Sequence, residues 1–125
     1  MSAAENKSQA QSAYKAFDAG DMGEVMRVMA DDIEWVVPGN STISGVYRGK
    51  EEVAGFFQTI AAKSFRTEPQ HFIADGDHVV VLTRISADGQ SADQADVLTF
   101  GPDGKITNFT AAADTAFQER VWGKR

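Results

Sequence analysis

The sequence contains no cysteine, so it forms neither a disulfide nor a thiolate metal site. It has no run approaching the ~20 apolar residues needed to span a bilayer, and its start lacks the apolar core of a secretory signal. Basic residues are in the minority, since 12 Lys and Arg stand against 18 Asp and Glu and give a net charge of −6. Such a surface repels a phosphate backbone. We therefore expect a cytoplasmic protein with no membrane or nucleic-acid partner.

The composition is that of an ordinary globular domain. Hydrophobic residues make up 42% of the 125 residues and charged residues 24%. A chain of this length buries a core without cross-links, and no repeat or low-complexity tract marks a linker. We expect a single domain over residues 1–125.

Three helices are predicted in the first half of the chain. Apolar residues recur with helical spacing in residues 10–17, 22–29 and 53–61. The first stretch stops at Gly20, and Asp21 is a candidate N-cap for the second. The third helix is expected to start after the loop described next and to cover the sheet.

One strand and one loop separate the second and third helices. Residues 33–37 alternate in polarity as a strand does, and Pro38-Gly39 ends the pairing. Residues 40–48 are predicted to be a loop that presents Tyr47, and Gly49 starts the third helix.

Four further strands are predicted in residues 65–74, 78–86, 92–100 and 105–113. Asp-Gly supplies the positive φ values of tight hairpins, so the strands should form an antiparallel meander. The three connecting pairs are Asp75-Gly76, Asp88-Gly89 and Asp103-Gly104.

Both alternating sides of the second of these strands carry apolar residues. Val79, Val81 and Ile85 share one side, and Val80 and Leu82 share the other. A sheet covered by helices on one face leaves the second set, with Val97, in water. We therefore expect a homodimer through the outer sheet face.

The order of elements predicts an α+β fold, with three N-terminal helices on one face of a curved, mostly antiparallel sheet. Five short motifs occur in the same order: AGD at 19–21, ADD at 30–32, W..PG at 35–39, G.Y.G at 45–49 and DGKI at 103–106. On these residues the chain resembles the NTF2-like superfamily, specifically its SnoaL-like, ketosteroid isomerase-like branch. The resemblance covers nearly the whole chain and implies a cone with an internal pocket. Because this superfamily holds isomerases, dehydratases, cyclases, epoxide hydrolases and non-catalytic modules, the fold does not settle the function.

Asp96 is the leading catalytic candidate. It lies inside a predicted strand on the same side as Leu98 and Phe100, where aspartate is disfavoured. A carboxyl that faces an apolar cavity has a raised pKa, which suits a general base or a neutral hydrogen-bond donor. The resemblance implies a similar role, since the matching strand of ketosteroid isomerases carries a protonated aspartic acid in the oxyanion hole. The alternative is an edge-strand aspartate that faces solvent or accepts from backbone N–H groups.

Two positions depart from the ketosteroid isomerases. Those enzymes place a general-base aspartate directly before the proline that ends the first strand, where this chain has Val37. Their oxyanion tyrosine aligns with Ala13, and Tyr14 is one place further, rotated by about 100° around the helix. Tyr14 is therefore either a core residue with its hydroxyl at the rim or an oxyanion donor. The missing base argues against steroid isomerisation.

Epoxide hydrolases of this fold use an Arg-x-Asp pair on a middle strand and a second aspartate near the end of the last strand. In this chain Ser86, two places after Arg84, stands where the pair needs its aspartate. Asp114 has no clear partner for that scheme, and we expect Arg84 in a surface or interface ion pair.

His71 shares a strand side with the apolar Ile73 and is the second catalytic candidate, because an imidazole suits the acid–base work that a polyketide cyclase needs. His78 opens a hairpin and should be solvated. Two separated histidines without cysteine give no metal-ligand spacing, so we expect no metal and no cofactor.

Aromatic residues from several predicted elements can come together around one pocket. Ala111 and Ala113 share a strand side with Phe109 and leave volume that larger side chains would fill. The alternative is that most of this set is simply core. The predicted pocket residues are Tyr14, Phe17, Trp35, Val37, Tyr47, Phe56, Phe57, Val81, Leu98, Phe109 and Ala111.

Two functions remain open. The first is an isomerase, cyclase or lyase that acts on a small, largely apolar carbonyl or hydroxyl compound, with Asp96 and His71 as catalytic residues. The second is a non-catalytic small-ligand-binding or dimeric accessory module.

Overall fold

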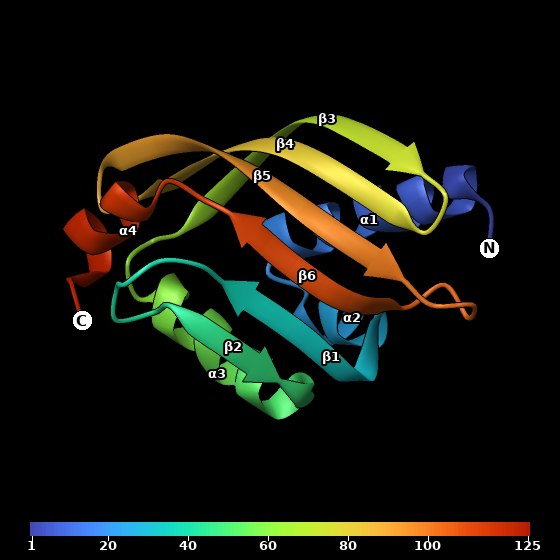
Figure 1. Ribbon diagram of the computed structural model, residues 1–125, viewed down its shortest axis with the longest axis horizontal. Coiled ribbons are helices and arrows are strands. Elements are labelled where there is room, and N and C mark those ends of the chain that lie inside the picture. The colour runs from blue at the N-terminus through green and yellow to red at the C-terminus, as the bar shows by residue number, and fades with distance from the viewer.

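A six-stranded curved sheet carries the fold of the computed structural model, which describes residues 1–125 (Figure 1). The α+β prediction, with helices gathered on one side of a curved sheet, is confirmed. The elements are α1 (Ala3–Asp18), α2 (Met22–Arg27), β1 (Met29–Val37), β2 (Gly45–Arg48), α3 (Gly49–Ala61), β3 (Arg66–Asp75), β4 (His78–Ala87), β5 (Gln90–Phe100), β6 (Ile106–Ala112) and α4 (Thr115–Trp122).

The strand order is β2-β1-β6-β5-β4-β3, so β6 and β5 lie in the middle. All neighbours are antiparallel except β1 and β6. The predicted meander is therefore present as β3 to β6. Asp88 and Gly89 have φ values of 54° and 76°, which is the pair of positive angles that a type I′ hairpin requires.

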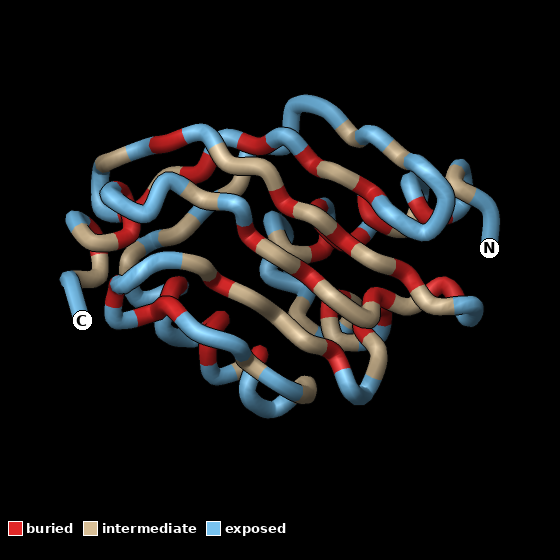
Figure 2. Tube along the Cα trace, viewed as in Figure 1, coloured by how far each residue is buried: buried red, intermediate tan, exposed pale blue.

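The helices divide the inner face of the sheet between them. α1 packs on β3 and β4, and α3 packs on β1 and β2 (Figure 1). α4 lies where β5 begins, with Arg120 Nε donating to Gln90 Oε1 at 3.1 Å. Buried residues recur along the central strands and on the sides of α1 and α3 that face them (Figure 2). None of the four helices combines the length and apolarity needed to cross a bilayer.

The structure corrects three sequence predictions. The second helix ends at Arg27, and Met29 begins β1. Part of the predicted loop is strand β2, in which Tyr47 pairs with Trp35. The fourth helix was not predicted, although Asp114 caps it by accepting from Phe117 N at 3.1 Å.

A continuous row of residues crosses the outer face of the sheet. The register aligns six positions, one on each strand: Ile73, Val80, Val97, Thr110, Val36 and Val46. Five of them are apolar. Ile73 is 54% exposed and Val46 40%, and Leu82 beside the row is 37% exposed. The alternation predicted for Val80 and Leu82 is therefore present.

Candidate functional site

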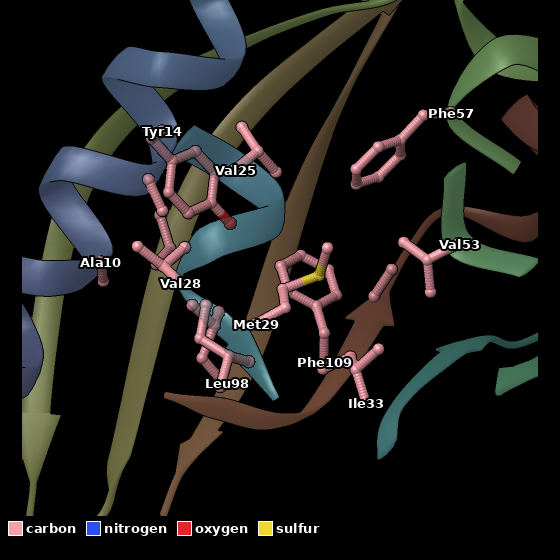
Figure 3. Close-up of a cluster of buried hydrophobic side chains, with 14 of the residues drawn as sticks. Ala10, Tyr14, Val25, Val28, Met29, Ile33, Val53, Phe57, Leu98 and Phe109 are labelled. Atoms are coloured by element: carbon pink, nitrogen blue, oxygen red, sulfur yellow. The ribbon is translucent and has the colours of Figure 1, made fainter. Parts of the chain in front are cut away.

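A pocket lies between the inner face of the sheet and helices α1, α3 and α4. It is lined by 23 residues, of which 19 are hydrophobic. Its cavity volume is about 90 Å³, several times what one water needs. In Figure 3 Tyr14 and Phe57 lie apart, with Met29 and Phe109 between them, and all four line this space from different elements. The pocket therefore has room for a small organic molecule.

Asp96 is the single carboxyl in the pocket wall. It lies on β5 between Val81 of β4 and Ala111 of β6, and only 1% of its surface is exposed. β5 is a central strand, and alternation places Asp96 on the inner side with Leu98 and Phe100. The interpretation of Asp96 as a solvated edge-strand residue is thus wrong.

Two side chains hold the Asp96 carboxyl. The Tyr14 hydroxyl donates to Oδ2, and Gln94 Nε2 donates to Oδ1 at 2.7 Å. Gln94 reaches it because residues two apart on a strand share a face. Each oxygen keeps one further lone pair, so the carboxyl can still accept or pass on a proton.

Burial raises the pKa of Asp96 to about 6, and the hydrogen bonds from Tyr14 and Gln94 offset part of that rise. The raised pKa predicted from the sequence has the same cause. Burial and the nearby carboxylate raise the pKa of Tyr14 well above its usual value. At neutral pH Tyr14 is therefore a neutral donor, and Asp96 titrates close to the working pH.

Tyr14, and not the aligned Ala13, supplies the hydroxyl. Its ring extends away from α1 in Figure 3 and packs edge-on against Phe72 at a centroid distance of 5.6 Å. Ala13 also lines the pocket but offers no polar atom. The Tyr14 hydroxyl therefore points inward to Asp96 and does not lie at the rim.

An aromatic wall forms the β1 side of the pocket. The Trp35 ring stacks on Phe109 with centroids 3.6 Å apart, and Phe57 meets Trp35 edge-on at 5.1 Å. Phe56 is tilted against Trp35 at 5.9 Å. These contacts fix the rings and leave a flat apolar surface.

Most predicted pocket residues do line this space. They are Tyr14, Phe17, Trp35, Val37, Phe56, Phe57, Leu98, Phe109 and Ala111. Two do not. Tyr47 donates its hydroxyl to Ile43 O at 2.7 Å and rests on Phe56, while Val81 is buried in the core beside the pocket.

His71 is not brought to the pocket, so that part of the catalytic prediction is corrected. It is exposed and pairs with Leu82, whose side chain lies on the outer face. His78 is exposed as predicted, and Arg84 forms the expected surface ion pair, with Asp93 at 3.1 Å. No three His, Cys, Asp or Glu side chains come close enough to hold a metal.

Several lining residues escaped the sequence analysis. The polar ones are Thr67, Gln94 and Gln118, and α4 adds Trp122. Gln94 could have been found by the same alternation that singled out Asp96. The signal for α4 was Asp114 followed by Phe117 and Val121 at helical spacing.

A model of the SnoaL-like domain matches residues 10–109. The chain belongs to the SnoaL-like domain family. It is 32% identical over 117 residues to the uncharacterized protein Rv0034 of Mycobacterium tuberculosis (strain H37Rv), with 87% of this chain and 89% of the relative covered.

Solved structures agree on the fold of this SnoaL-like chain. Bal32a, from a soil-derived mobile gene cassette, has a TM-score of 0.84 at 21% identity and covers 96% of this chain and 98% of its own. TerC, co-crystallized with polyporic acid, has a TM-score of 0.82 at 25% identity, with 94% and 97% covered.

Proposed function

We propose that this SnoaL-like protein is an enzyme of the isomerase, cyclase or lyase type. Its substrate is a small, largely apolar compound with a carbonyl or hydroxyl group, and Asp96 moves the proton. The observation that carries the proposal is the Asp96 carboxyl, which is buried in an apolar pocket, held by Tyr14 and Gln94, and has a pKa of about 6. A pKa near the working pH is what general acid–base catalysis requires.

The proposed step needs only one carboxyl. The ionised Asp96 accepts a proton from the carbon next to a substrate carbonyl, and the electron pair of that C–H bond moves into an enolate. The neutral carboxylic acid then returns the proton to another carbon of the substrate in an isomerisation, to the alkoxide formed when the enolate carbon adds to a second carbonyl in a cyclisation, or to the leaving group that the enolate expels in an elimination. Tyr14 and Gln94 orient the carboxyl throughout, since each donates to one of its oxygens.

The pocket around Asp96 suits this chemistry. No Lys, Arg or His lines it, so no salt bridge quenches the carboxyl. Its lining is mostly hydrophobic, so few protein groups compete with the substrate and Asp96 for the proton. The co-crystallization of TerC with polyporic acid supports a small molecule as the ligand of this fold.

A non-catalytic binding module is the second candidate, and Val37 favours it. This residue is only 3% exposed and lines the pocket at the position where ketosteroid isomerases carry their general base. A pocket with one carboxyl can bind a ligand without turning it over.

Hydrogen–deuterium exchange separates the two candidates. Para-methoxyacetophenone is incubated with the protein in D₂O, and NMR follows the loss of the methyl protons next to its carbonyl. We expect exchange above the buffer rate with the wild type and a loss of at least a hundredfold in Asp96→Asn. Asp93→Asn is the matched control, because Asp93 lies on the exposed side of the same strand.

The expected exchange has a defined pH dependence. The base form of Asp96 is the ionised one, so the rate should rise with pH and level off above about 6. Binding of the ketone without exchange, in the wild type and Asp96→Asn alike, would exclude the enzyme and leave the binding module.

A further inference from the structure

Four buried side-chain polar atoms in the chain have no hydrogen-bond partner: Asn6 Oδ1, Trp35 Nε1, Thr67 Oγ1 and Trp122 Nε1. Asn6 lies on α1 away from the pocket, with its amide donating to Gly76 O. The other three all belong to residues that line the pocket. Buried polar groups are nearly always paired, because an unpaired one loses the hydrogen bonds that it makes in water. Their concentration around one pocket indicates that the pocket is built for a polar-edged ligand.

Ring contacts hold both indole groups in the positions where they have no protein acceptor. Trp35 is fixed between Phe109, on which it stacks, and Phe57, which meets it edge-on. Trp122 packs against Phe65 and Phe117, each at a centroid distance of 6.2 Å. Both N–H groups are therefore buried beside the pocket without an acceptor from the protein.

The three groups surround Asp96 from different elements. Trp35 is on β1, which is separated from β5 by β6, and Thr67 is on β3, which is separated from β5 by β4. The strand register places Trp35 level with Leu98, two residues beyond Asp96, and Thr67 level with Ala92, four residues before it, so the two lie on opposite sides of Asp96. Trp122 comes from α4 at the end of the chain. A ligand that fills the pocket can therefore reach Asp96 with one group and these donors with others.

The charge of the pocket limits the ligand further. Its 23 lining residues include no Lys, Arg or His, and Asp96 is the only carboxyl. A carboxylate or phosphate inside would have no cation to pair with and would be repelled by the ionised Asp96. The acceptors that meet the indole and hydroxyl groups must therefore be neutral.

We propose that the pocket selects a neutral ring compound with oxygen acceptors at its edge, and that Trp35, Thr67 and Trp122 bind those oxygens. Carbonyl, hydroxyl and ether oxygens all meet this description. The inference rests on the proposed function, in which Asp96 acts on a second group of the same molecule, and it names the class of that molecule.

Three matched compounds test the selection. Para-methoxyacetophenone and para-ethylacetophenone share a ketone and nearly the same size, but only the first has an ether oxygen at the far end. Para-methoxybenzoate replaces the ketone by an anion. Affinities are measured by ligand-observed NMR, and fluorescence gives a second readout because both tryptophans of the chain line the pocket.

We expect the methoxy ketone to bind about threefold to tenfold more tightly than the ethyl ketone, which is the usual worth of one hydrogen bond. The benzoate should bind at least tenfold more weakly than the methoxy ketone. At least one of Trp35→Phe, Thr67→Val and Trp122→Phe should remove the preference for methoxy over ethyl. Where Thr67→Val removes it, Thr67→Ser should restore it.

Ile60→Val is the packing control, because Ile60 lines the pocket without a polar atom and should change the affinity for both ketones equally. Equal binding of the two ketones, equal binding of the benzoate, or no binding of either ketone would overturn the proposal. Asp96→Asn should keep the methoxy preference while losing proton exchange. The affinity measurements therefore test the ligand class, and the exchange measurement tests the proposed reaction, so either proposal can fail without the other.

Discussion

Replacing Asp96 by asparagine should stabilise the protein in a pH-dependent way. The folded state raises the pKa of this carboxyl from 3.8 to about 6. The folded chain therefore holds a proton that the unfolded chain has released, so the contribution of Asp96 to stability is complete below 3.8 and is lost as the pH rises through about 6. The gap of about 2.2 pH units at 1.36 kcal/mol each corresponds to about 3 kcal/mol.

The asparagine keeps the shape of the site and can still accept from Tyr14, but it does not ionise. The free energy of unfolding of Asp96→Asn relative to the wild type should thus increase by about 2.5 kcal/mol between pH 4 and pH 8, since part of the effect falls below pH 4. Urea unfolding at several pH values, followed by tryptophan fluorescence, measures this difference.

Asp93→Asn is the control for the change in net charge, and its stability difference from the wild type should vary far less with pH, because Asp93 is exposed. A difference for Asp96→Asn that stays flat with pH, or a variant less stable than the wild type at every pH, would refute the reasoning. The ionised carboxyl would then be well solvated or well paired.

Three further predictions concern other parts of the molecule. Tyr14→Phe removes a hydrogen bond that lowers the pKa of Asp96, so the midpoint of the pH–rate profile for deuterium exchange should move above about 6; an unchanged midpoint would contradict this role. Phe57→Ala should lower the free energy of unfolding in urea by about 3 kcal/mol, because Phe57 is 6% exposed and packs on Trp35. Gln58→Ala is the control and should cost little, because Gln58 is exposed. A loss well under 1 kcal/mol in Phe57→Ala would make Phe57 a pocket wall only. We propose that the apolar row on the outer face pairs with a second copy, so sedimentation should show a dimer that Leu82→Lys converts to monomer; a 13.5 kDa wild-type monomer at every concentration would exclude it.

The sequence located Asp96 because strand alternation is a local property. Asp96 shares one side of its strand with apolar residues such as Leu98, so it stands out without knowledge of the neighbouring strands. Its partner Tyr14 was harder to assign, since one residue along a helix rotates the side chain by about 100°. An alignment offset of one position therefore exchanged Tyr14 for Ala13.

The face of the sheet on which the His71 side chain lies depends on tertiary contacts, which a local sequence pattern does not reveal. β3 has a register shift between Pro69 and His71, and its apolar Ile73 is 54% exposed. Apolarity on that strand thus did not mark the inner face. β2 was missed because four residues are too few for a periodic pattern, and it exists by pairing with β1.

The measurement that tests the account most directly is a ¹³C NMR titration of the Asp96 carboxyl carbon in the wild-type protein. Its signal is assigned by its disappearance from the spectrum of Asp96→Asn. A midpoint of about 6 is predicted, because the carboxyl is buried in an apolar pocket with Tyr14 and Gln94 as its only partners. A midpoint at or below 3.8 would show that burial does not destabilise the ionised carboxyl, and Asp96 would then be a structural residue.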